Sequence, residues 1–71
     1  MIRKISIGAD YKEGMHYTVG QTFGGMTIDT IRQLNPQHYE IWVMNENNEV
    51  FLWKQIVDMP CVVEMDVKAF G

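Results

Sequence analysis

The residues with the greatest capacity for chemistry lie near the C-terminal end of the chain. Cys61 is the only cysteine and therefore the only thiol nucleophile. Glu64 and Asp66 are two positions apart, so on a strand their carboxylates would share one face about 7 Å apart. Such a pair could hold a divalent cation or act as a general acid and base. The structural alternatives are a cysteine that packs in the interior and acidic residues that keep an edge strand soluble.

Known motifs for metals and phosphates are missing from the sequence. His16, His38 and Cys61 match no zinc-binding spacing. The glycine-rich stretch at residues 20–25 lacks the Gly-Lys-Ser/Thr ending of a phosphate loop and is typical of a turn. No set of nucleophile, base and orienting group can be assembled from these residues. We therefore expect a protein that is not an enzyme and that uses no metal or cofactor.

Aromatic and cationic residues are better candidates, and they point to binding. Trp53 is followed directly by Lys54, and a flat ring beside a cation can stack on a base while the cation neutralises a phosphate. Core packing is the alternative for the rings, and simple surface exposure is the alternative for the histidine. The candidate ligand-binding residues are Tyr11, Lys12, His16, Tyr17, Arg32, Trp53 and Lys54.

Alternation of apolar and polar residues predicts that strands position these side chains. The pattern favours strands over residues 2–7, 15–19 and 61–67, with a polar loop over residues 8–14. In the last strand, Cys61, Val63 and Met65 are expected on the apolar face, opposite Glu64 and Asp66.

Residues 26–34 are ambiguous, because their apolar positions fit both a strand period and a helical spacing. The segment is short and rich in β-branched residues, which favours a strand with a bulge near Thr30–Ile31. A single helical turn is the alternative. Asn35-Pro36 ends the segment in either case.

A hairpin is the clearest supersecondary signal. Two apolar runs, Tyr39–Met44 and Glu49–Trp53, flank the polar loop of residues 45–48. The first run is apolar on both faces, with Ile41 on one side and Trp42 on the other. Such a strand is expected to be covered on both sides, inside a barrel wall or at a subunit interface.

The whole chain, residues 1–71, is expected to form a single mostly β domain: a small antiparallel barrel or a strongly bent sheet of five to six strands. A chain this short buries only about 60% of the surface of its unfolded form. With one cysteine and no metal site, association into a homo-oligomer is the remaining way to stabilise it.

Charge and hydropathy narrow the choice of partners and compartment. Six basic and nine acidic residues give a net charge of −3, and the basic residues are too scattered to track a nucleic acid backbone. No apolar run approaches the ~20 residues needed to span a membrane. The N-terminal residues lack the apolar stretch of a signal peptide. With a single unpaired cysteine, we expect the protein to reside in the cytoplasm.

Several pieces of the chain resemble the small accessory proteins of tailed bacteriophages. They are Gly8-Ala-Asp-Tyr-Lys-Glu-Gly-Met15, Tyr17-Thr-Val-Gly-Gln21, Phe51-Leu-Trp-Lys54 and Met59-Pro60. The resemblance implies a counter-defence role in the cytoplasm of a host, and it supplies no site residues. Some proteins of this kind are small oligomers that sequester a cyclic-nucleotide immune signal, and others bind and block a host protein.

Two functional hypotheses follow. In the first, a homo-oligomer sequesters a small anionic ligand such as a nucleotide, with the aromatic candidates stacking on the base and the cationic ones neutralising phosphate. In the second, the protein inhibits a host protein through an exposed strand edge or a patch of methionine and tryptophan.

Overall fold

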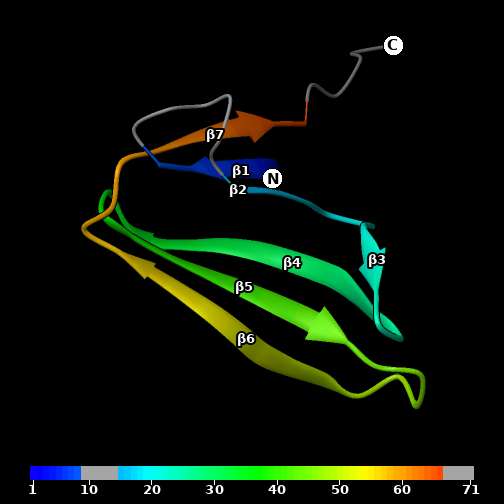
Figure 1. Ribbon diagram of the computed structural model, residues 1–71. Helices are drawn as coiled ribbons and strands as arrows, with labels where there is room; N and C mark the ends of the chain where they lie inside the picture. The colour runs from blue at the N-terminus through cyan, green and yellow to red at the C-terminus, as the bar shows by residue number, and fades with distance from the viewer. Residues whose placement is uncertain (9–14, 67–71) are drawn as a thin grey trace, which may run out of the picture.

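The computed structural model describes residues 1–8 and 15–66, which form seven strands and contain no helix (Figure 1). The strands are β1 (Ile2–Ile7), β2 (Met15–Thr18), β3 (Thr22–Phe23), β4 (Met26–Asn35), β5 (His38–Met44), β6 (Val50–Val57) and β7 (Cys61–Met65). They make two antiparallel sheets, with strand orders β2-β1-β7 and β3-β4-β5-β6. The predicted mostly β fold is confirmed, in the form of strongly bent sheets rather than a closed barrel. None of the described residues belongs to a helix that could cross a membrane.

The core lies between the two sheets, because β1, β2 and β7 lie over one side of β4, β5 and β6 (Figure 1). Alternation along each strand turns every second side chain inward, and β-branched residues suit this half-buried surface. The buried side chains are Ile2, Ile5, Tyr17, Ile28, Ile31, Tyr39, Ile41, Val43 and Ile56.

Residues 26–34 belong to a strand, as predicted, and the helical alternative is wrong. The register of β4 against β5 shifts between Ile28 and Thr30, which makes Asp29 the extra residue of a bulge. The bulge lies just before the predicted position near Thr30–Ile31. It resets the alternation, so Ile28 and Ile31 both face the core despite their three-residue spacing. The bulge therefore explains why the sequence also fitted a helical period.

The predicted hairpin is formed by β5 and β6. Its loop is closed by Asn48, which has a φ of 63°, and by the Asn45 side chain, whose Oδ1 accepts hydrogen bonds from the backbone N–H groups of Asn47 and Glu49. Asparagine tolerates the left-handed region better than most residues. In β5, Ile41 is fully buried, whereas Trp42 on the other face is half-buried.

The last strand follows its predicted alternation over most of its length. Cys61 and Val63 pack against the core, and Glu64 faces outward, where its Oε1 lies 2.9 Å from Arg3 Nη2. Met65 lies on the core side, as expected, because it is directly opposite the buried Ile2, but at the end of the strand its side chain is 51% exposed.

Candidate ligand-binding cleft

A second bulge, in β6, positions the Trp53-Lys54 pair. Ile41 is opposite Lys54, and Trp42 is opposite Leu52, so Trp53 is the extra residue of the strand. A bulge of this kind re-aims side chains that would otherwise alternate. Lys54 shares the inner side with Ile41, and Trp53 also packs against the core. Two consecutive side chains thus lie on one side of the sheet.

The Trp53 ring joins three strands that are distant in the sequence. Its centroid lies 5.4 Å from that of Tyr17 on β2, with the ring planes nearly perpendicular at 86°. The Phe23 ring on β3 lies 4.8 Å from it at a tilt of 39°. Edge-to-face and tilted contacts suit the quadrupoles of the rings. This aromatic cluster holds the backbone of β6 in place at the bulge.

Lys54 is a fixed cation beside that cluster. Its Nζ lies 4.7 Å from the centroid of Trp53 and 6.0 Å from that of Tyr17, within the range of cation–π attraction. Among residues 1–8 and 15–66, no carboxylate forms an ion pair with it. The ammonium group is therefore positioned by rings, and its charge is not neutralised by the described part of the chain.

An apolar cleft opens next to Lys54, between the edge strands β2 and β6. It has a volume of about 220 Å³. The Tyr17 hydroxyl donates a hydrogen bond to Met15 Sδ at 2.9 Å, which orients the methionine at its wall. The residues that line this cleft, called the Lys54 cleft below, are Ile7, Met15, Tyr17, Lys54, Gln55, Ile56 and Met59.

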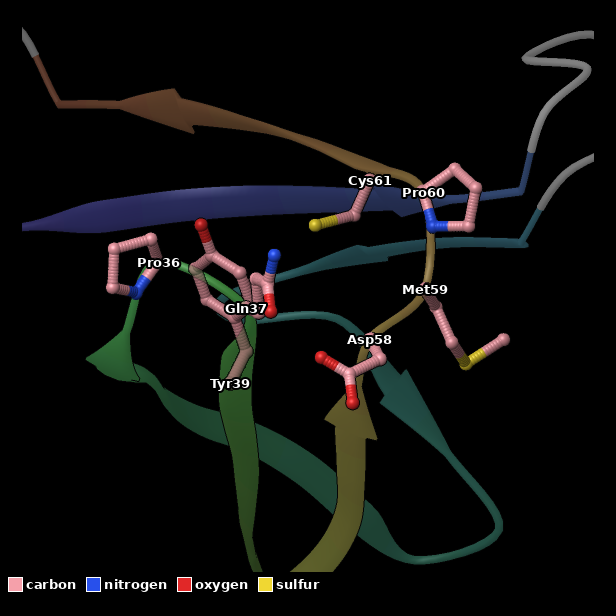
Figure 2. Close-up of a pocket in the computed structure, with 7 residues that line it drawn as sticks. All are labelled: Pro36, Gln37, Tyr39, Asp58, Met59, Pro60 and Cys61. Atoms are coloured by element: carbon pink, nitrogen blue, oxygen red, sulfur yellow. The ribbon is translucent and has the colours of Figure 1, made fainter.

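A second and larger cavity, of about 440 Å³, lies on the other side of Met59 (Figure 2). Asp58 is the only charged residue in its lining, which makes the cavity unfavourable for an anion. The Asp58 backbone is left-handed, with a φ of 53°, and its N–H donates to the carbonyl of Gln37 at 2.9 Å. The lining residues are Pro36, Gln37, Tyr39, Asp58, Met59, Pro60 and Cys61.

Cys61 lies beside the hydroxyl of Tyr39 in this cavity (Figure 2). Burial raises the pKa of Tyr39 above its usual value, and the charge and hydrogen bond of Cys61 raise it further. Gln33 Nε2 also donates to the Tyr39 hydroxyl at 3.2 Å. A phenol with a raised pKa stays protonated at neutral pH, so Tyr39 is not a base that could activate the thiol.

The structure brings together three of the sequence-predicted residues, Tyr17, Trp53 and Lys54. It places His16 on the outer face of the three-stranded sheet, with Nδ1 2.8 Å from Ser6 Oγ. Arg32 lies on the outer face of the other sheet, opposite Glu40.

Tyr11 and Lys12 lie outside the described residues. Within those residues, no group of three or more His, Cys, Asp or Glu side chains could hold a metal ion.

Sequence reasoning missed Phe23, Met15 and Met59 as parts of the site. Phe23 belongs to a stretch that was interpreted only as a turn, and nothing in its neighbours indicates that its ring contacts Trp53. Met15 alternates with Tyr17 on the inner side of β2, a signal that could have placed both at one wall. Met59 follows β6 and lines both cavities.

Comparisons of this chain with protein-family models, with curated proteins and with solved structures found no match.

Proposed function

We propose that this protein is a non-enzymatic binding protein that sequesters a small anionic ligand in the Lys54 cleft. The observation that carries the proposal is the Lys54 ammonium group, held over two aromatic rings beside an apolar cleft and unpaired with any carboxylate of the described residues. A pre-positioned cation loses less conformational entropy when it binds an anion than a freely moving one does.

Charge and size restrict the ligand. One lysine lines the cleft, so it balances one negative charge. The volume of about 220 Å³ is below the range of roughly 300–1,000 Å³ that is usual for drug-sized ligands. A cyclic mononucleotide, with one phosphodiester charge and one flat base, fits both limits better than a nucleoside triphosphate. The base would lie against Tyr17, Met15 and Met59, because these residues line the cleft and Trp53 does not.

A sequestering protein lowers the free concentration of its ligand without changing it. This agrees with the protonated state of Tyr39 beside Cys61 and with the resemblance to phage accessory proteins of the counter-defence type. In that role the ligand would be an immune signal of the host cell. The ligand recovered from the complex is therefore expected to have an unchanged mass.

Calorimetric titration with a panel of cyclic mononucleotides and their linear counterparts tests the proposal. Lys54→Met keeps the length and apolar stem of the side chain and removes its charge. A hydrogen bond to a charged group contributes about 1.5–3 kcal/mol, so we expect the affinity to fall by roughly 10- to 100-fold. Arg32→Met removes a cation from a different face and is the matched control, with unchanged affinity.

Two results would count against the proposal. One is the absence of binding to every member of the panel, at concentrations at which the folded protein is stable. The other is an equal loss of affinity in Lys54→Met and Arg32→Met, which would indicate non-specific attraction of anions to any positive charge.

A further inference from the structure

Met15 and Met59 line the Lys54 cleft and remain open to solvent. Met15 is 62% exposed, and Met59 is 51% exposed. In Figure 2 the Met59 side chain extends away from Tyr39 and Cys61, and Met59 also belongs to the lining of the Lys54 cleft. Oxidation of a methionine converts its apolar thioether into a polar sulfoxide. The cleft therefore has walls that a small oxidant can reach from solvent and make polar.

The Met15 sulfur is held in a defined position at the wall of the cleft. The Tyr17 hydroxyl donates a hydrogen bond to Met15 Sδ at 2.9 Å. The Tyr17 ring in turn contacts Trp53 and lies below the Lys54 ammonium group. A thioether sulfur is a weak acceptor with two lone pairs, so this hydrogen bond leaves one lone pair for an oxidant. A sulfoxide oxygen at Met15 would accept the same hydroxyl proton, which would keep that oxygen in the cleft.

Lys54 is the group that such an oxygen would meet. Among the described residues that line the cleft, it is the only charged one. No carboxylate of residues 1–8 and 15–66 forms an ion pair with it. Hydrogen bonds donated by an ammonium group are stronger than those between neutral groups. Because a sulfoxide oxygen carries a partial negative charge, it offers the ammonium group the same kind of acceptor that an anionic ligand would bring.

We propose that hydrogen peroxide oxidises Met15 and Met59 to sulfoxides, whose oxygens bind the Lys54 ammonium group and block the cleft to an anion. The sulfur donates an electron pair to one peroxide oxygen, and the O–O bond breaks as the S–O bond forms. The proton on the transferred oxygen passes to the departing hydroxide, which leaves as water, so sulfur is oxidised and peroxide is reduced. The effect on ligand binding rests on the proposed function, because it concerns regulation of the same cleft.

Acylation of Lys54 tests the inference without any ligand. The full chain is treated with hydrogen peroxide and then briefly with acetic anhydride. Peptide mass spectrometry locates the sulfoxides and compares the labelling of Lys54 with that of Lys4, which lies on the other sheet. A hydrogen bond to a charged group should lower the labelling of Lys54 by roughly 10-fold, and that of Lys4 should not change. Circular dichroism checks that the oxidised chain stays folded.

Two variants separate the methionines of the cleft from the other groups that peroxide oxidises. Met15→Leu combined with Met59→Leu keeps the walls apolar and removes both sulfurs, so peroxide should leave the labelling of Lys54 unchanged. Met65→Leu removes a methionine that is also 51% exposed but lines neither cavity, and it should respond as the wild-type chain does. Both variants retain Cys61, so a loss of labelling in the double variant would overturn the inference. Methionine sulfoxide reductases should restore the labelling of the wild-type chain.

Calorimetric titration of the reduced and oxidised chains, with the cyclic mononucleotide of the panel that binds most tightly, measures the effect on binding. Affinity should fall by roughly 10-fold or more in the oxidised wild-type chain and stay unchanged in the double variant. Unchanged labelling of Lys54 in a chain that carries sulfoxides at Met15 and Met59 would overturn the inference, as would unchanged affinity. A reduced chain that binds no nucleotide would overturn the proposed function alone, because the labelling still decides whether the sulfoxides occupy the Lys54 ammonium group.

Discussion

The two faces of the β5–β6 hairpin carry side chains of similar apolarity in different surroundings. Ile41 and Val43 face the three-stranded sheet and are fully buried. Trp42 and Met44 alternate with them, face away from it and stay half-buried. Folding of one chain thus uses only one of the two apolar faces. The difference teaches that the stability of the single chain rests on one side of these strands, and substitutions on the two sides should have unequal effects on stability.

The largest expected effect is on the inner face. Ile41→Ala removes a fully buried side chain and leaves a cavity between the sheets, which lowers the free energy of unfolding by about 2–5 kcal/mol. Urea denaturation at low protein concentration measures this change. Met44→Ala on the opposite face is the control, with a smaller loss. An equal loss in the two variants would break the distinction between the faces.

The next effect concerns the bulge at Trp53. Trp53→Ala removes the contacts with Tyr17 and Phe23, and because the ring is half-buried we expect a loss of about 2 kcal/mol, less than the ~3–5 kcal/mol of a buried ring. Ligand affinity should fall as well, since Lys54 loses the ring that positions it. Trp53→Phe should retain part of the stability and part of the ligand affinity. Full ligand affinity in Trp53→Ala would show that the aromatic cluster does not contribute to ligand binding.

A smaller effect appears in the pH dependence of stability. Burial, followed by Cys61, raises the pKa of Tyr39 above 10.0 in the folded chain. In the unfolded chain the phenol ionises near its usual value, so its contribution to stability is complete below pH 10.0 and is lost as pH rises through the folded pKa. Tyr39→Phe should therefore show a shallower loss of stability above pH 10.0 in urea denaturation. If the free energy of unfolding fell equally steeply with pH in the wild-type protein and in the variant, the raised pKa of Tyr39 would be contradicted.

The smallest expected effect on a dilute sample is that of Trp42→Ala. A half-buried side chain on the outer face should change the free energy of unfolding by about 1 kcal/mol or less. At high concentration the wild-type protein should gain stability through association, and the variant should not. Urea midpoints at a low and a high protein concentration measure the stability of the dilute protein and its gain through association. A wild-type midpoint that is independent of concentration would contradict the homo-oligomer expected from the sequence.

Alternation of side chains made most of the strands predictable. The hairpin, the first two strands and β7 follow from period-two patterns, because a strand half-covered by a core must alternate. The pairing of Trp53 with Lys54 could likewise be selected from adjacent residues. The sequence could not show that His16 and Arg32 lie apart from this pair, because their positions depend on which sheet and which face each strand occupies.

Residue types and their period were therefore enough to specify a β chain, its hairpin and an apolar surplus on both hairpin faces. The two bulges were decided by the tertiary structure. At Asp29 a bulge turns Ile28 and Ile31 to the same side, and at Trp53 a bulge turns Trp53 and Lys54 toward Tyr17. An extra residue in a strand is stabilised by the strands that pack against it, not by its own sequence. The Lys54 cleft depends on that packing.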